Sequence, residues 1–226
     1  MIKLISSMAT RQVLAELAAQ WQTATGIEVN IESVGGVDAA KRVQAGEVFD
    51  GIVLASDAID KLAAGGHVLA GSRHDLVRSS VAVAVKAGTA LPDISTESAL
   101  RSAIEVAPTI GYSTGPSGVA LVKLFERWGM WDALQARIVQ VPPGVPVGTL
   151  VARGEVALGF QQLSELMHLD GIIVVGTLPD AVAITTIFSA ATCTVSKQQE
   201  DLAKLFAFMA ASGSASVKQK HGMQSA

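Results

Sequence analysis

The loop Gly111–Gly118 brings together residue types that can hold an anion. It reads Gly-Tyr-Ser-Thr-Gly-Pro-Ser-Gly, and its candidate donors are Ser113, Thr114, Ser117 and the backbone of Gly118. The hydroxyls can donate hydrogen bonds, and a helix beginning at Ser117 would add unpaired backbone N–H groups at its positive end. The alternative is an ordinary strand-to-helix turn in which Ser117 only caps the helix.

A second loop of this kind stands near the start of the chain. The segment Ser6–Thr10 contains three hydroxyls, those of Ser6, Ser7 and Thr10, and Arg11 follows it. The guanidinium of Arg11 has the fork shape that suits a carboxylate. An anion nearby would also relieve the repulsion between this cation and the N-terminus of its helix. A solvated first-turn arginine is the alternative.

The elements that must position these loops are those of an α/β chain. In the first third, strands at 2–5, 27–33 and 49–54 alternate with three helices. The first helix ends at Gly26, the second spans 39–45 after a break at Gly35-Gly36, and the third runs through 56–62 with Ser56 as its cap. This alternation is typical of a parallel sheet with crossover helices.

A second α/β set follows a continuous strand at 79–86. A short strand ends at Ile110, Pro142-Pro143-Gly144 forms a turn, and Ser196 caps a final amphipathic helix. The remaining predicted elements are helices at 96–104, 117–128, 131–134, 147–153 and 161–167, strands at 137–141, 157–160 and 172–175, and a β-rich segment at 181–195.

The simplest topology for these elements is a pair of lobes. We expect lobe I to comprise residues 1–80 and 188–226 and lobe II residues 81–187, with two crossing strands as a hinge. Ligands of open α/β sheets bind beyond the carboxyl ends of the strands. A cleft between the lobes would therefore collect four loops, with Gln161 and Gln162 at their edge. These loops are Ser6–Arg11, Gly35–Asp38, Tyr112–Gly118 and Pro143–Gly148.

Composition limits the possible partners. Half of the 226 residues are apolar, only 4% are aromatic, and the net charge of −3 is scattered along the chain. No basic face stands out, so we expect no nucleic-acid partner. The single cysteine, Cys193, lies in an apolar run, which predicts a buried, inert thiol.

Motifs for other chemistries are missing. The chain has no Gly-x-Ser-x-Gly, no phosphate-binding Gly-Lys-Ser/Thr and no metal-ligand spacing, so we expect neither a metal nor a cofactor. No run of about 18 apolar residues predicts a membrane span. No signal peptide is visible either. The protein is then either periplasmic, if a signal peptide was removed, or cytoplasmic.

Several short motifs resemble the type II periplasmic solute-binding proteins, and most closely the molybdate-binding proteins of ABC transporters. They are the loop after Ile2–Ile5, Thr25-Gly26, Gly46–Asp50, Trp128-Gly129-Met130-Trp131-Asp132, Leu150–Glu155 with Leu158-Gly159, and Gly222-Met223. The resemblance implies an anion held by hydroxyls and backbone N–H groups of both lobes. It also implies an ABC transporter as a possible partner. We expect the protein to be a monomer.

Carried over residue by residue, the family pattern shows departures. Its first serine falls at or beside Ala9, its serine pair falls on Gly35-Gly36, and its tyrosine falls on Gln162. Its backbone donor matches Val145–Val147, whereas Arg11 stands where a small residue is usual. The candidate binding residues are therefore Ser6, Ser7, Thr10, Arg11, Gly35, Gly36, Ser113, Thr114, Ser117, Gly118, Val147, Gln161 and Gln162.

Arg11 and the glutamines favour a planar, multiply charged organic acid over a compact oxyanion. We expect a protein that binds an organic di- or tricarboxylate or an oxyanion. Two alternatives stay open: a cofactor-free aconitate isomerase, which the fold also resembles, and a molybdate- or tungstate-binding transporter component. For an isomerase, Glu165, Asp38 and Glu32 are candidate bases by position only.

Overall fold

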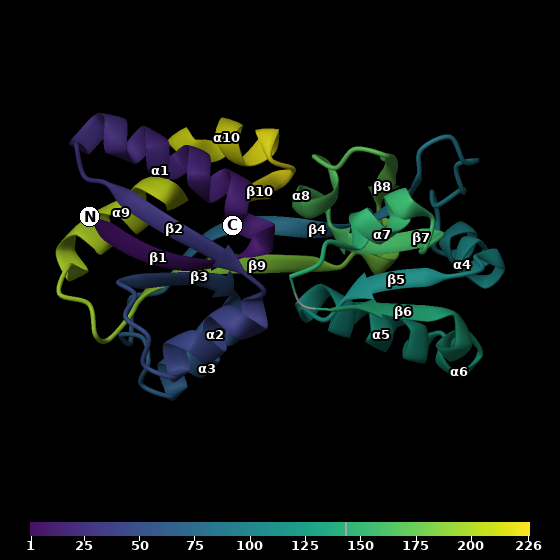
Figure 1. Cartoon of the computed structure of the whole chain (residues 1–226), viewed down its shortest axis with the longest axis horizontal. Coiled ribbons are helices and arrows are strands. Elements are labelled where there is room, and N and C mark those ends of the chain that lie inside the picture. Colours follow the sequence, from purple (N-terminus) through teal and green to yellow (C-terminus); the bar gives the residue numbers. More distant parts are fainter. Residues whose placement is uncertain (143) are drawn as a thin grey trace. The chain divides into compact units, whose positions relative to one another are not determined.

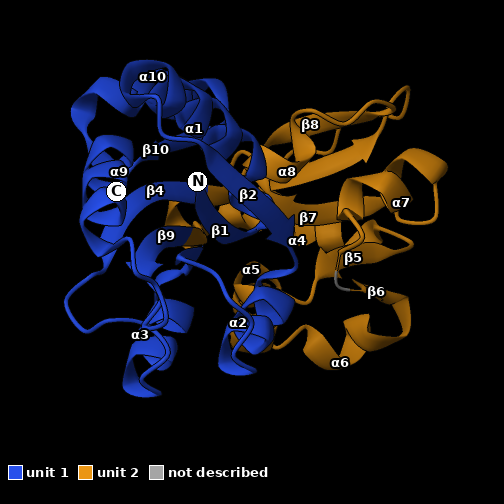
Figure 2. Cartoon of the chain, turned by 60° about the vertical axis from the view of Figure 1, so that its left-hand side comes forward, with its two compact units in different colours: residues 1–79, 186–226 blue, residues 80–185 orange. Residues whose placement is uncertain are grey.

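The computed structural model describes residues 1–142 and 144–226. The described chain divides into two compact units, residues 1–79 with 186–226 (unit 1) and residues 80–185 (unit 2) (Figure 2). The chain passes between them within strand β4 (His74–Lys86) and at the start of β9 (Thr185–Thr192). The predicted lobe boundaries and the predicted ligand cleft between the lobes stay predictions.

Unit 1 is built on a mixed sheet. Its strands are β1 (Ile2–Ser7), β2 (Val29–Val34), β3 (Gly51–Ala55), β9, β10 (Met223–Ser225) and the first part of β4. Strand β1 pairs in parallel with β2 and β3, whereas β9 is antiparallel to β3 and β10 to β4. The carboxyl ends of β1 and β2 therefore meet at one edge, with Ser7 opposite Val34.

Helices cover both faces of this sheet. One face carries α1 (Arg11–Thr25), α9 (Gln199–Ala210) and α10 (Ala215–Lys220), and the other carries α2 (Gly36–Gln44) and α3 (Ser56–Ala64). The apolar stripe of α1 is buried, as its helical spacing predicts. The helix ends where predicted, because Gly26 has φ of 74° and closes it in the left-handed conformation.

Unit 2 has a sheet of its own. Its strands are the second part of β4, β5 (Ile110–Ser113), β6 (Ile138–Val141), β7 (Leu158–Gln162) and β8 (Ile172–Thr177). Strand β5 is parallel to both β6 and β7, whereas β7 and β8 are antiparallel to β4. The carboxyl ends of three parallel strands thus lie at the same edge of unit 2.

The helices of unit 2 also form two layers. The larger core lies under α4 (Glu97–Val106), α5 (Pro116–Arg127) and α6 (Trp131–Leu134). The opposite face carries α7 (Val147–Arg153) and α8 (Leu163–Leu166). In Figure 1, α5 and α6 lie below β5 and α7 lies above it. Because α5, α7 and α8 follow β5, β6 and β7, all three helices begin near the shared strand edge.

Around the candidate loops, the predicted boundaries need correction. Strand β5 begins at Ile110, where the sequence placed its end, and Tyr112 and Ser113 belong to it. Helix α5 begins at Pro116 with Gly115 as its N-cap, so Ser117 is not the cap. Gln161 and Gln162 lie in strand β7 and not in a helix. Here tertiary packing, not local pattern, decides where the strands end.

Two predicted caps are also wrong. The Ser56 hydroxyl donates to the Ile187 carbonyl, and that of Ser196 donates to Asp50 Oδ1. Ala55 and Gln198 are the N-caps of α3 and α9, neither with a side-chain capping bond. Two elements also begin earlier than predicted, α2 at Gly36 and β4 at His74. Helix α9 is not the final helix, because α10 follows it.

The bounds of two helices and the burial of Cys193 agree with the prediction. The helices at 131–134 and 147–153 have the predicted bounds, and Cys193 is buried. Of the predicted turn at 142–144, Pro143 lies outside the described residues. No helix in the described part of the chain is long and apolar enough to span a bilayer.

Candidate functional site

The loop between β5 and α5 in unit 2 presents donors that the protein itself does not use. Ser113 and Thr114 are half-buried and Ser117 is buried, yet none of their hydroxyls has a hydrogen-bond partner among the described residues. The first bond of α5 runs from Val119 N to the Gly115 carbonyl at 3.1 Å. The N–H groups of Ser117 and Gly118 precede that bond, and Pro116 has none, so two amides join the three hydroxyls.

Gly118 is a steric requirement of this loop. A Cβ atom on Gly118 would lie 1.8 Å from the Ser113 carbonyl oxygen. The helix therefore approaches the end of β5 more closely than any side chain would allow. The Ser113 hydroxyl also lies beside the N-cap of α5, because a Cβ on Gly115 would be 3.7 Å from Ser113 Oγ.

The predicted donors Val147 and Gln161 are bonded to each other. Val147 N, at the start of α7, donates to Gln161 Oε1 at 2.8 Å, and both residues are buried. The other end of the same amide, Nε2, donates to Glu165 Oε2 at 2.7 Å. The Val147 N–H is thus occupied within unit 2, and Gln161 links α7 to α8. Gln162 is buried next to it in β7.

Glu165 is the carboxylic acid that this link holds. The residue is half-buried overall, and its carboxyl end is the desolvated part. This burial raises the pKa of Glu165 to about 7, and the hydrogen bond from Gln161 opposes the rise. Such a carboxyl can accept and release a proton near neutral pH. Sequence reasoning identified Glu165 by its position only, because the burial that distinguishes it arises from packing.

In unit 1, the first predicted loop is mostly closed on itself. Residues Met8–Thr10 form a 3₁₀ turn capped by Ser7, whose Oγ accepts from Ala9 N at 3.3 Å. The Thr10 hydroxyl donates to the Ser7 carbonyl at 3.0 Å, and Ser6 Oγ lies 2.8 Å from Ser33 Oγ. Ser6 and Thr10 are fully buried. Ser7 is half-buried, and its hydroxyl proton has no acceptor among the described residues.

The glycine pair lies beside Ser7. Gly35 is the N-cap of α2 without a side-chain bond, and the first helical bond runs from Ala39 N to its carbonyl at 2.9 Å. The N–H groups of Gly36, Val37 and Asp38 precede that bond and have no helical acceptor. A Cβ on Gly36 would lie 3.8 Å from Ser7 Oγ, so this N-terminus and the Ser7 hydroxyl are neighbours.

Arg11 is the cation of this region. It begins α1, its side chain is exposed, and its guanidinium has no hydrogen-bond or ion-pair partner within the part of the chain that the structure describes. The arrangement leaves its fork available to a carboxylate. That Arg11 binds one stays a prediction.

The other two candidate bases, Glu32 and Asp38, make interactions that stabilise the fold. Glu32 is paired with Arg42, whose guanidinium holds the pKa of that carboxyl below its usual range. Arg42 also pairs with Glu47 and lies over the Phe49 ring. Asp38 stands in the first turn of α2, where a negative charge stabilises the helix dipole. Neither residue resembles the desolvated carboxyl of Glu165.

A shallow pocket of about 260 Å³ adjoins the unit 2 loop at Gly118. Its lining consists of Tyr112, Gly118, Val119, Val122, Lys123, Glu126 and Gln140. Desolvation raises the pKa of Tyr112, which therefore stays protonated at neutral pH. The described residues contain no group of three His, Cys, Asp or Glu side chains that could hold a metal ion.

Comparison with solved structures defines the class of protein. The periplasmic molybdate-binding protein of Azotobacter vinelandii superposes with a TM-score of 0.81 at 20% identity, covering 99% of this chain and 98% of that one. The L-phospholactate-bound structure of PEB3 has a TM-score of 0.76 at 14% identity, covering 99% of each chain. The chain has the mixed α/β fold of the type II periplasmic binding proteins.

Sequence comparison then gives the family. Residues 2–224 match the family described as bacterial extracellular solute-binding protein, and the chain belongs to that family. An aconitate isomerase from Pseudomonas sp. is 35% identical over 229 residues, covering 99% of this chain and 87% of the relative. The resemblance inferred from the sequence is thus confirmed at the level of family and fold.

Proposed function

We propose that this protein binds aconitate and interconverts its trans and cis isomers without a cofactor. The observation that carries the proposal is the 35% identity to an aconitate isomerase over 99% of the chain. The solved structures are too distant in sequence to speak for a ligand.

The donor set fits a tricarboxylate. The loop of unit 2 contains three hydroxyls and two amides without partners among the described residues, and unit 1 adds Ser7, the start of α2 and the Arg11 guanidinium. Neutral dipoles can hold several carboxylate oxygens, while Arg11 can pair with one carboxylate in a bidentate manner.

The chemistry is a proton shift. Aconitate is a propene with a carboxylate on each carbon, so its CH₂ group is next to a carboxylate and to the double bond. Removing a proton there spreads negative charge over the two terminal carbons of the three-carbon unit and their carboxylates, and hydrogen-bond donors stabilise that charge. Returning the proton to the other end of the three-carbon unit moves the double bond and can exchange the isomers. No electron is gained or lost, so no redox cofactor is needed.

Incubation with trans-aconitate tests the proposal directly. The purified protein, exhaustively dialysed against a chelator, is mixed with the acid, and the appearance of the cis isomer is followed by proton NMR. We expect turnover without any added cofactor and the same final isomer ratio from either starting isomer. Absence of turnover with a folded sample would contradict the proposal.

A second candidate function is binding without turnover. The family favours it, because its description is that of a solute-binding protein. A thermal-shift panel of trans-aconitate, citrate, molybdate and tungstate distinguishes the ligands, since a ligand of the folded state raises the melting temperature. A large shift with molybdate alone would favour a transporter component over an isomerase.

The family description fits a location outside the cytoplasm. We therefore propose a periplasmic protein, with an ABC transporter as partner if the second candidate function holds, and a monomer in solution. Cell fractionation of the native host tests the location. Light scattering on the purified protein, with and without trans-aconitate, tests the oligomeric state.

A further inference from the structure

Unit 2 holds one carboxyl in a setting unlike that of a structural acid. Helix α8 packs against β7, α7 and β8, and neither strand contributes a titratable side chain. The cation of α7, Arg153, is exposed and lies 3.9 Å from Glu155. His168 and Asp170 follow α8 in exposed positions. No charged group contributes to the raised pKa of Glu165. Desolvation of the carboxyl raises this pKa.

Gln161 fixes the position of this carboxyl. Its Oε1 accepts from Val147 N at 2.8 Å and its Nε2 donates to Glu165 Oε2 at 2.7 Å, so both ends of the amide are engaged. The amide therefore cannot flip without losing both bonds. Glu165 Oε1 has no hydrogen-bond partner among the described residues, which leaves one oxygen to act on a ligand.

The location is also that of a ligand-facing group. Glu165 follows the carboxyl end of β7, and the unpaired hydroxyls of Ser113 and Thr114 lie at the carboxyl end of β5, which is the parallel neighbour of β7. Ligands of such sheets bind outside this edge. The donor loop and the acid thus share one edge of unit 2.

We infer that Glu165 is the residue that moves the proton in the proposed isomerisation, and that Gln161 is its positioning residue. The inference rests on the proposed function. The Glu165 carboxylate takes a proton from the aconitate CH₂ group; the C–H bond breaks, its electron pair enters the π system, and the double bond shifts by one carbon. The same carboxyl group then returns a proton to the carbon that had been vinylic, which restores Glu165 and balances the reaction.

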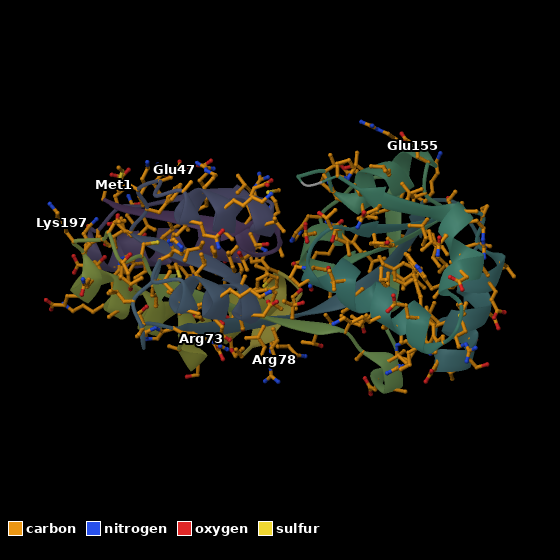
Figure 3. All side chains as sticks on the ribbon, turned by 90° about the horizontal axis from the view of Figure 1, so that it is seen from below. Met1, Glu47, Arg73, Arg78, Glu155 and Lys197 are labelled. Carbon is orange, nitrogen blue, oxygen red and sulfur yellow. The ribbon has the colours of Figure 1, made fainter. Side chains whose placement is uncertain are left out.

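The substitution Glu165→Gln tests the catalytic role. It keeps the shape of the side chain and removes the base, so we expect at least a 1,000-fold loss of kcat while trans-aconitate still raises the melting temperature. Glu155→Gln is the matched control, because the Glu155 side chain is 55% exposed at the periphery of unit 2 (Figure 3). We expect it to keep wild-type turnover.

The outcomes separate the two proposals. Wild-type turnover with an inactive but ligand-binding E165Q supports both. Wild-type turnover that E165Q retains would overturn the role of Glu165 and leave the isomerase function standing. A folded wild-type protein that binds trans-aconitate without turnover would overturn the proposed function, and the inference with it.

The pH profile of kcat tests the positioning role. We expect wild-type kcat to rise with pH around 7, as Glu165 loses its proton. Gln161→Met removes the hydrogen bond that lowers the pKa of Glu165, so the midpoint of the profile should move to higher pH. Gln161→Glu keeps the side-chain shape if the methionine variant does not fold, and it should move the midpoint in the same direction, because two carboxyl groups then share the site. An unchanged midpoint in a folded, active variant would overturn the positioning role.

Discussion

The loops Ser6–Arg11 in unit 1 and Ser113–Gly118 in unit 2 look alike in sequence and differ in structure. Each follows an apolar strand, contains three hydroxyls and leads into a helix. In unit 1, Ser6 is bonded to Ser33, Thr10 to a carbonyl, and only Ser7 keeps a hydroxyl proton without an acceptor in the described chain. In unit 2, none of the three hydroxyls has a partner there.

Backbone geometry explains the difference. The chain leaves β1 through a 3₁₀ turn, which folds Thr10 back onto the Ser7 carbonyl and lets Ser7 cap the turn. In unit 2, only Thr114 and Gly115 separate β5 from α5, and Gly118 lets the helix approach the end of the strand closely. The number of hydroxyls in a loop therefore does not give the number of available donors.

The largest expected effect is a steric one. Gly118→Ala places a methyl group 1.8 Å from a backbone oxygen, so the β5–α5 connection must shift, and we expect a loss of about 3 kcal/mol in the free energy of unfolding. Gly36→Ala is the matched control in unit 1, where a Cβ would be in ordinary contact at 3.7 Å from Leu54. Urea unfolding measures both. A G118A variant as stable as G36A would contradict the close approach.

The buried acid of unit 2 predicts a pH dependence of stability. The pKa of Glu165 is raised from 4.5 to about 7, so the folded protein keeps a proton that the unfolded chain has lost. The contribution of Glu165 to the free energy of unfolding therefore falls as pH rises from about 4.5 to 7, by an amount on the order of 2–3 kcal/mol.

The difference in unfolding free energy between wild type and E165Q isolates the contribution of Glu165. Urea unfolding at pH 5 and pH 8 should show the variant gaining stability relative to wild type at the higher pH. Acids of unit 1 with lowered pKa values, such as Glu32, stabilise the fold more at higher pH. Their contribution is the same in wild type and E165Q, so it cancels when the two unfolding free energies are subtracted. A difference that does not change with pH would contradict the burial of this carboxyl.

Arg11 tests whether unit 1 takes part in binding. If its guanidinium meets a carboxylate, Arg11→Ala should weaken the affinity for trans-aconitate by about 1.5–3 kcal/mol in calorimetric titration. Arg127→Ala is the control, because Arg127 is also an exposed arginine, at the C-terminal end of α5. Equal affinities of the two variants would place Arg11 in solvent.

The smallest effects distinguish the two kinds of hydroxyl. Ser117→Ala removes a hydroxyl without a partner, so it should weaken binding by about 1 kcal/mol and leave the unfolding free energy nearly unchanged. Ser6→Ala breaks the bond to Ser33, so it should lower the unfolding free energy by about 1 kcal/mol and leave affinity unchanged. The reverse pattern would show that the comparison of the two loops is wrong.

The amino-acid sequence determined the architecture of this protein. Periodic apolar residues and the glycines that end helices predicted α/β units, because both signals act within a few residues of the chain. The same reading placed β5 three residues too early and put Gln161 in a helix. Helical spacing and a buried strand look alike over so short a run, and packing against neighbouring strands decided between them.

Only the tertiary structure decided which site residues are available. The Ser6 and Thr10 hydroxyls and the Val147 N–H are hydrogen-bonding groups in the right loops, yet each is already bonded within its own unit, to Ser33, to the Ser7 carbonyl and to Gln161 respectively. Glu165 is one acid among many in the sequence, and burial beside Gln161 sets it apart. The Ser6–Ser33 and Val147–Gln161 bonds join residues 27 and 14 positions apart, and desolvation depends on packing. The sequence therefore named the candidate donors and Glu165 by position but did not separate the available groups from the occupied ones.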